Sequence, residues 1–238
     1  RGSLLLTGPK SPAIMEDLTG AKMDQASFPW LTHQQVTIAG IDALAIRVSF
    51  AGEAGWELHV AMDDLLTVWN AIETAGQSHQ LGLFGMLALD SMRLEKGYRS
   101  WKSDLTSDYT MYESGLGRWV SPNKDDFIGK AALQAEQQRG ASKRYVVMTL
   151  DNPDDGASFG EAVYLSSIRD GNGDDIGLVV SSGYGHRVGK SIAYGVVEEN
   201  ALSGDVTGLH VNVLGRKRMV SIVEAEALYD AGNEKVRA

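Results

Sequence analysis

The sequence predicts an α+β fold, in which a mixed α/β domain is followed by an antiparallel β-barrel. Two patterns lead to this prediction. In the N-terminal part, alternating apolar segments are mixed with segments whose apolar residues recur at the helical period. Over residues 143–227, short alternating segments follow one another, separated by turn sequences such as DGNGDD and SSGYG. We therefore expect domains over residues 1–140 and 141–238, with a boundary between Gln138 and Arg144.

Glycine and proline residues mark the ends of the elements expected in the first domain. Pro12 suits the first turn of a helix, and Gly20 and Gly76 end helices. Gly40 allows a tight link between two strands. The expected elements are strands at residues 3–6, 35–38, 43–49 and 56–61, helices at 12–20, 62–76 and 82–98, and a short helix from residue 128 or 129. The expected inner positions are Leu66, Val68, Trp69 and Ile72 in the second helix, and Leu83, Met86, Leu87 and Leu94 in the third.

The second domain is expected to contain strands without a long helix. Its apolar segments are short, and glycine-rich turns separate them at intervals typical of a small barrel or sandwich. The expected strands lie at residues 144–150, 162–168, 175–182, 191–197, 210–214 and 217–225.

Composition excludes several classes of function. The chain has 31 acidic and 22 basic residues, a formal net charge of −9, which disfavours nucleic-acid binding. Without cysteine it has no disulfide, thiolate metal site or cysteine nucleophile, and its five histidines show no metal-ligand spacing. No apolar run reaches the ~20 residues that span a bilayer. We therefore expect no metal and no membrane segment, and a location in the cytoplasm or, in a eukaryote, the mitochondrial matrix.

Residues 48–60, VSFAGEAGWELHV, hold two glutamates beside glycines and aromatic residues. In a strand that begins at Trp56, Trp56 and Leu58 share one face, and Glu57 and His59 share the other. Glu57 is then either a solvent-facing strand residue, with Glu53 in a turn, or the inner carboxylate of a pocket. A carboxylate in a pocket can accept two parallel N–H bonds from a guanidine-like edge such as that of a pterin.

Several segments resemble the aminomethyltransferase family, which comprises the glycine-cleavage T-protein and its relatives. RVSFAGEAGWELHV is similar to the family's tGytGEdGfEi stretch. GLFGMLALDSMRLEKGYRSWKSDL most resembles the form found in the C-terminal halves of dimethylglycine and sarcosine dehydrogenases. NKDDFIGKAAL, SSGYGHRVGKSIAYGVV and ALYDAGNEKVRA resemble further family segments in their usual order. This resemblance, which covers essentially the whole chain, implies tetrahydrofolate as cofactor and transfer of a one-carbon unit from an amine-linked methylene.

The resemblance also implies positions for the folate contacts. Glu57 matches the glutamate that contacts the pterin, and Phe50 stands where the family has a pocket-lining tyrosine. Leu89 replaces an arginine of the T-protein motif, while Arg93 remains, either near the folate or in an intramolecular ion pair. KGYRSW either contacts the folate tail or forms a packed loop. The candidate folate-binding residues are Glu57, Phe50, Arg93, Tyr98 and Trp101.

One family feature has no counterpart in this sequence. Family members carry a long segment before the stretch that matches SLLLTGPKS, and that segment holds a catalytic aspartate. We therefore expect a partial family domain, no assignable catalytic residue, and poor activity of this chain by itself. An upstream flavin domain or a partner chain would complete the enzyme. The apolar SLLL segment is expected to lie on the surface that meets it, or to cause self-association.

Two other functions stay open. The first is a folate-binding accessory protein without transferase activity, although the related iron–sulfur assembly proteins carry a cysteine where this chain has KGYRSW. The second is a demethylase for a sulfonium substrate of the dimethylsulfoniopropionate type. SSGYGHRVGKS does not match a phosphate-binding loop, because Tyr184 stands where that motif requires glycine, and no dinucleotide fingerprint occurs.

Overall fold

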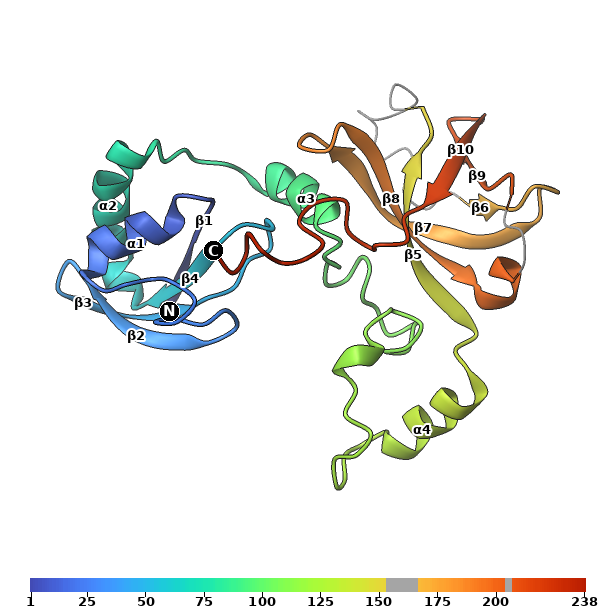
Figure 1. Cartoon of the computed structure of the whole chain (residues 1–238), viewed down its shortest axis with the longest axis horizontal. Coiled ribbons are helices and arrows are strands. Elements are labelled where there is room, and N and C mark those ends of the chain that lie inside the picture. The colour runs from blue at the N-terminus through green and yellow to red at the C-terminus, as the bar shows by residue number, and fades with distance from the viewer. Residues whose placement is uncertain (153–166, 204–206) are drawn as a thin grey trace. The chain divides into compact units, whose positions relative to one another are not determined.

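The computed structural model describes residues 1–152, 167–203 and 207–238 (Figure 1). The chain forms two compact units. Unit 1 comprises Arg1–Lys96 together with Tyr229–Ala238, and unit 2 comprises Gly97–Leu228. Residues 229–238 therefore return to the unit that contains residues 1–96. The boundary expected between Gln138 and Arg144 separates the mixed domain from the β-rich domain, which is not the same division as these two units. That boundary stays a prediction.

Unit 1 contains a four-stranded antiparallel sheet with the strand order β1-β4-β3-β2. The strands are β1 (Gly2–Thr7), β2 (His33–Ile38), β3 (Ile41–Ile46) and β4 (Gly55–Val60). Ala39 and Gly40 both have positive φ, 51° and 79°, which suits the tight hairpin between β2 and β3. β4 lies inside the sheet, whereas β1 and β2 are its edge strands.

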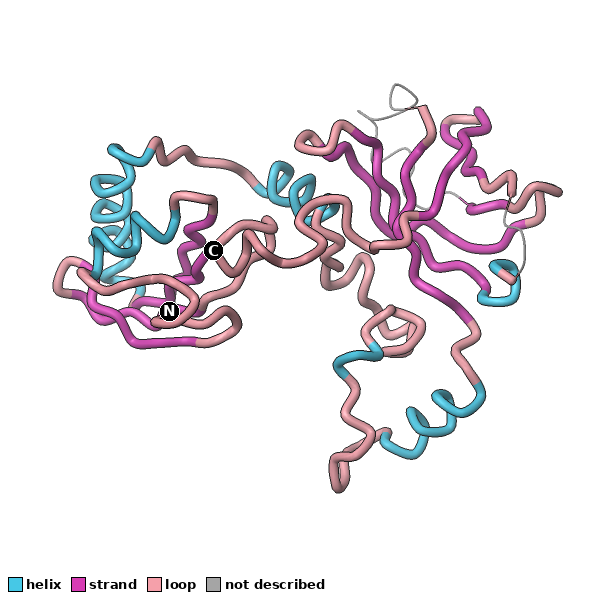
Figure 2. The backbone as a smooth tube through the Cα atoms, viewed as in Figure 1, coloured by secondary structure: helices cyan, strands magenta, loops and turns pink. Residues whose placement is uncertain are grey.

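Two helices pack against the sheet of unit 1, as the tube in Figure 2 shows. They are α1 (Ser11–Thr19) and α2 (Leu65–Gly76), with short 3-10 turns η1 (Met62–Asp64) and η2 (Gln77–His79) at the two ends of α2. α1 has proline in its first turn and ends at Gly20, whose φ is 69° and whose N–H bonds the Glu16 carbonyl. The shared core contains Ile14, Met15, Trp56, Leu58, Val60, Val68 and Ile72.

The helix α3 (Met86–Glu95) differs from the prediction. Leu83, Met86 and Leu87 were expected inside but are 76%, 75% and 89% exposed, and only Leu94 of the expected four is buried. Leu66 of α2 is likewise exposed. The helical period identified an apolar stripe, but it cannot show whether other residues cover that stripe. An apolar groove of about 580 Å³ lies here, lined by β1, α2 and the residues from Leu81 to Leu89.

Within the described residues, unit 2 contains the expected barrel, closed by six antiparallel strands in the order β10-β5-β8-β7-β6-β9. They are β5 (Lys143–Leu150), β6 (Ser167–Arg169), β7 (Asp175–Gly185), β8 (Lys190–Glu198), β9 (His210–Val213) and β10 (Arg216–Ile222). Most of the strand expected at residues 162–168 lies outside the described residues. Apolar side chains, among them Met148 and Ile168, form the barrel core. They pack closely against Gly195, where an added Cβ would lie 2.4 Å from Ile168 Cδ1 and 2.9 Å from Met148 Cε.

A polar network ties the segment before the barrel to its first strand. This segment contains η3 (Gly117–Trp119) and α4 (Lys130–Arg139). Elsewhere in unit 2, a 3-10 turn, η4 (Glu199–Leu202), follows β8. The carboxylate of Glu113 accepts hydrogen bonds from Ser142 Oγ at 2.5 Å and from the Thr110 N–H at 3.1 Å. Burial raises the pKa of Glu113, but these bonds outweigh burial and hold the pKa below its usual value.

Candidate functional site

The turn before β4 is anchored to the junction of β1 and α1. The carbonyl oxygen of Ala54 accepts hydrogen bonds from Thr7 Oγ1 at 3.1 Å, Gly8 N at 2.9 Å and Ser11 Oγ at 2.8 Å. Gly55 packs closely here, because an added Cβ would lie 2.9 Å from Thr7 Oγ1. These contacts therefore fix the last residues of the β3–β4 connection, Ala54 and Gly55, against β1 and α1.

The expected alternation along β4 is confirmed. Trp56 and Leu58 are fully buried in the core that faces the helices. The Glu57 side chain, on the other face of the sheet, is 44% exposed, and its Oε2 lies 3.3 Å from His59 Nε2. The carboxylate is therefore accessible from the face that the helices leave open.

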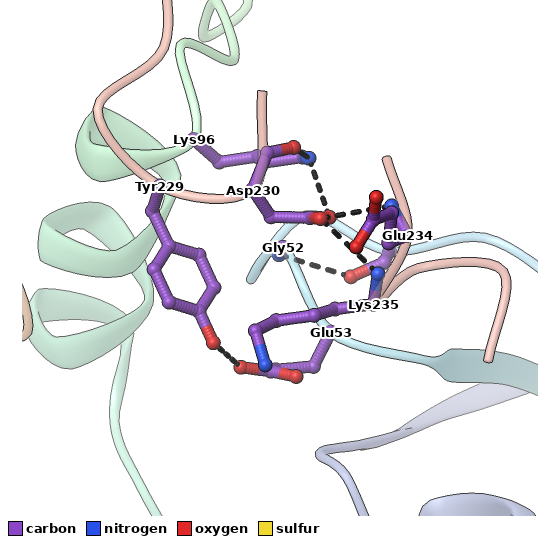
Figure 3. A network of polar contacts seen from close by, with 8 residues as sticks. Gly52, Glu53, Lys96, Tyr229, Asp230, Glu234 and Lys235 are labelled. Carbon is purple, nitrogen blue, oxygen red and sulfur yellow. Dashed lines mark hydrogen bonds and ion pairs between the residues drawn. The ribbon is translucent and has the colours of Figure 1, made fainter. Parts of the chain in front are cut away.

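Glu53, in the turn, differs from Glu57 because its carboxylate accepts a hydrogen bond from Tyr229, a residue near the end of the chain. Figure 3 shows Tyr229 reaching across to this turn. Gly52 beside it has a φ of 81° and donates its N–H to Ser49 Oγ at 3.1 Å. A Cβ on Gly52 would lie 3.1 Å from Lys96 Cδ, so the turn passes directly over the Lys96 side chain.

Lys96 and Asp230 form a buried ion pair. Their side chains are 2% and 4% exposed, and Lys96 Nζ lies 2.8 Å from Asp230 Oδ2 (Figure 3). Asp230 Oδ1 also accepts the N–H groups of Glu234 at 2.8 Å and Lys235 at 3.2 Å. Burial raises the pKa of Asp230, but the bonds from Lys96 and from these amides outweigh burial and hold the pKa below its usual value.

Two further predicted residues, Arg93 and Phe50, also belong to unit 1. Arg93 is almost fully buried, and its Nε donates to Asp90 Oδ1 at 2.7 Å. This contact matches the interpretation of Arg93 as part of an ion pair within α3. Phe50 is half-buried in the turn, two residues before Gly52.

The remaining two predicted residues, Tyr98 and Trp101, belong to unit 2. Tyr98 is half-buried and Trp101 is 76% exposed. Between them, Arg99 stacks on Tyr145, with the guanidinium carbon 4.1 Å from the ring centroid, and pairs with Glu226 at 3.3 Å. The KGYRSW loop is thus packed at Arg99 and open at Trp101.

Sequence reasoning missed the network of Glu53, Lys96, Tyr229 and Asp230. Lys96 and Asp230 are 134 residues apart, and neither carries a local pattern that indicates its partner. The only available signal was that both stand in segments that resemble the family, EKGY and ALYD. The resemblance identifies these two segments as family segments, but it does not predict that Lys96 and Asp230 are in contact.

In the part of the chain that the structure describes, no group of three or more histidine, cysteine, aspartate or glutamate side chains is arranged to hold a metal ion. No described helix combines the length and apolar character needed to cross a bilayer.

Comparison with known proteins first defines a class. Residues 1–124 match the profile of the GCVT N-terminal domain, and residues 143–230 match that of the glycine cleavage T-protein C-terminal barrel domain. This combination of a mixed domain and a barrel is the architecture observed here. The chain belongs to the glycine cleavage T-protein family.

Dehydrogenases and aminomethyltransferases are among the curated relatives that match the chain. It is 37% identical over 200 residues to mitochondrial sarcosine dehydrogenase of Mus musculus, covering 83% of this chain and 21% of the relative. It is 32% identical over 224 residues to mitochondrial dimethylglycine dehydrogenase of Mus musculus, covering 94% and 25%. It is also 32% identical over 218 residues to the aminomethyltransferase of Halothermothrix orenii, covering 92% and 58%.

A solved structure has the same fold. The crystal structure of glycine cleavage system aminomethyltransferase T from Bartonella henselae matches with a TM-score of 0.76 at 23% identity. The match covers 92% of this chain and 58% of that one. The chain thus spans little more than half the length of the aminomethyltransferases that it matches, and about a quarter or less of the dehydrogenases.

Proposed function

We propose that this chain forms the folate-binding part of an enzyme that transfers a one-carbon unit from an amine-linked methylene to tetrahydrofolate. Membership of the T-protein family and similarity to aminomethyltransferases and to sarcosine and dimethylglycine dehydrogenases support this function. The observation that carries the proposal is the position of Glu57. Its carboxylate stands on a central strand, on the sheet face opposite the helices, and is accessible.

The residues of unit 1 fit the polar edge of a pterin. A strand-borne carboxylate can accept two parallel N–H bonds from the aminopyrimidine edge, a charge-assisted arrangement stronger than neutral hydrogen bonds. Glu57 has the exposure needed to accept them, and the ring of Phe50 offers an apolar surface for stacking. Tetrahydrofolate, when bound, supplies the amine nitrogens that receive the carbon.

We assign Arg93, Tyr98 and Trp101 lesser parts in this proposal. Arg93 already pairs with Asp90, so its contribution is to hold α3 in shape. Trp101 has the exposed aromatic surface that a folate tail would contact, and Tyr98 stands close to it in the sequence. None of these residues is proposed to act as the catalytic acid or base.

We propose that further polypeptide, either an attached domain or a partner chain, completes the enzyme. Its proposed parts are the aspartate that the family resemblance implies and, by similarity to the dehydrogenases, a flavin domain that oxidises an N-methyl amine. The exposed apolar residues beside the open edge of β1 support a protein-covered surface. In the isolated chain we propose that a second copy covers it. The names of the mitochondrial dehydrogenases support a mitochondrial location in a eukaryote.

Isothermal calorimetry with tetrahydrofolate tests the binding site. We expect Glu57→Gln to weaken binding about tenfold or more, because one charge-assisted hydrogen-bonded contact is worth about 1.5–3 kcal/mol. Asp63→Asn, which removes an exposed carboxylate from η1, serves as the matched control and should bind like the unsubstituted chain. Unchanged affinity of Glu57→Gln would place the pterin elsewhere.

Turnover measurements separate the proposed function from its alternatives. Folate binding without carbon transfer, even in a protein of the relatives' full length, would indicate an accessory protein. Folate-dependent consumption of dimethylsulfoniopropionate, with none of N-methyl amines, would indicate the sulfonium demethylase.

A further inference from the structure

Residues 229–238 form a C-terminal strap that is fastened to unit 1 at three points. Near its start lies the buried pair of Lys96 and Asp230. Val236 is buried at 1% exposure. At the end of the strap, the fully buried guanidinium of Arg47 donates to the carbonyl oxygen of Ala238 at 2.5 Å. A loosely attached segment would not bury an ion pair, an apolar side chain and an arginine contact together.

The first of these points fixes the strap most tightly. The Lys96 ammonium donates both to the carboxylate of Asp230 and to its backbone carbonyl. The same carboxylate accepts the two amide bonds from Glu234 and Lys235. Since one side chain organises both the ion pair and the following turn, the position of Asp230 sets the path of the strap.

Tyr229, which precedes Asp230, links the strap to the turn before β4. Its backbone N–H donates to the Glu95 carbonyl oxygen at 2.9 Å, and its hydroxyl donates to the carboxylate of Glu53 (Figure 3). The turn itself lies over Lys96 at Gly52. The first half of the turn is thus held by the strap, whereas its second half is held by the β1–α1 junction.

We propose that the Lys96–Asp230 pair is a clamp that positions the turn of residues 49–54 through Tyr229 and Glu53. Lys96, Asp230 and Tyr229 are then positioning residues, and the strap is part of the site's supporting structure. The two glutamates of the motif have separate roles. Glu53 is held by the strap, while the Glu57 carboxylate, which contacts His59 at one oxygen, stays accessible to a ligand. The effect on ligand binding rests on the proposed function, but the mechanical coupling does not.

Hydrogen exchange measured by mass spectrometry on the chain without ligand tests the coupling. Lys96→Met should raise exchange about tenfold or more in peptides covering residues 229–238 and 49–57, because it leaves the Asp230 carboxylate without its buried partner. Tyr229→Phe removes only the hydroxyl, so it should raise exchange in residues 49–57 and leave the strap unchanged. Lys22→Met removes an exposed lysine of unit 1 that lies outside the strap and the turn, and it is the matched control.

The direction of these effects distinguishes positioning from general loss of structure. Exchange in the β2–β3 hairpin, residues 33–46, should stay unchanged in Tyr229→Phe. Lys96→Arg, which keeps the cation, should restore most of the protection lost in Lys96→Met. If Tyr229→Phe leaves residues 49–57 as protected as before, the clamp does not position the turn and the proposal is wrong.

Calorimetry with tetrahydrofolate then tests the link to the ligand. Tyr229→Phe should weaken binding about three- to tenfold, by loss of one hydrogen bond that orders the turn. If the unsubstituted chain does not bind tetrahydrofolate, the proposed function fails while the exchange result still decides the clamp. If it binds and Lys96→Met binds equally well, the proposed function stands and the positioning role is overturned.

Discussion

The barrel of unit 2 and the sheet of unit 1 are stabilised by different means. The barrel core contains apolar side chains such as Met148, Ile168 and Val211, and the strands that the structure describes close on one another. Unit 1 has an apolar core as well, but it also buries Arg47, Lys96 and Asp230, and it leaves β1 as an open edge. Buried charges favour one arrangement of partners, while an open apolar edge calls for a covering chain. The sheet of unit 1, with its open edge and the accessible carboxylate of Glu57, therefore suits a ligand and a partner better than the closed barrel does.

The largest effect on stability is expected from the clamp. Lys96→Met should lower the free energy of unfolding by about 3–5 kcal/mol, because it leaves a buried carboxylate without its charge partner. The double variant Lys96→Met/Asp230→Leu should recover part of this loss, since both charges are then gone. Urea unfolding measures both. A loss below 1 kcal/mol in the single variant would show that the pair contributes little and would weaken the contrast with the barrel.

A smaller loss is expected from crowding the barrel wall. A Cβ on Gly177 would lie 2.3 Å from the Val196 carbonyl oxygen, a backbone atom of the neighbouring strand. We expect Gly177→Ala to lower the free energy of unfolding by about 1–3 kcal/mol, the usual cost of overpacking. Gly82→Ala, where nothing lies within 4 Å of the added carbon, is the control. Equal stability of the two variants would mean that the barrel strands shift to accommodate the added carbon at little cost in free energy.

Acid should weaken the clamp in a defined direction. The pKa of Asp230 in the folded chain lies below its usual value of 3.8, so the unfolded chain takes up the proton first as the pH falls. The stability contributed by Asp230 is therefore complete above its unfolded pKa and is lost as the pH falls through the folded pKa, beginning at about pH 5. Asp230→Asn should flatten this part of the curve of unfolding free energy against pH. If the unfolding free energy of Asp230→Asn falls with pH as steeply as that of the unsubstituted chain, the acid sensitivity comes from other groups, among them Glu113.

The smallest change in stability, with a clear change in association, is expected at the groove. Leu83 and Leu87 are largely exposed, so Leu83→Ser/Leu87→Ser should alter the free energy of unfolding by no more than about 0.5 kcal/mol. It should, however, shift the isolated chain from dimer to monomer in light scattering after size-exclusion chromatography. Asp63→Asn serves again as a control. A chain that is monomeric before substitution would contradict self-association through this surface.

Much of the fold follows from local patterns. The alternation of Trp56, Leu58 and Val60 with Glu57 and His59 predicted which side chains of β4 are buried, and the structure confirms it. Turn sequences between short apolar segments predicted the barrel. These predictions succeed because strand alternation and turn chemistry depend on neighbours within a few residues. For the same reason, the helical period located α3 but not the side of it that other residues cover.

By itself, then, the sequence determined most of the helices and strands in the described residues, the barrel, the family and the orientation of Glu57. Only the tertiary structure decided that Lys96 meets Asp230, that Arg47 reaches Ala238, and that Tyr229 holds Glu53. Each of these contacts joins residues far apart along the chain. Their formation depends on the path of the backbone between them, because an ion pair or hydrogen bond needs its atoms within about 3–4 Å and no local pattern sets such a distance.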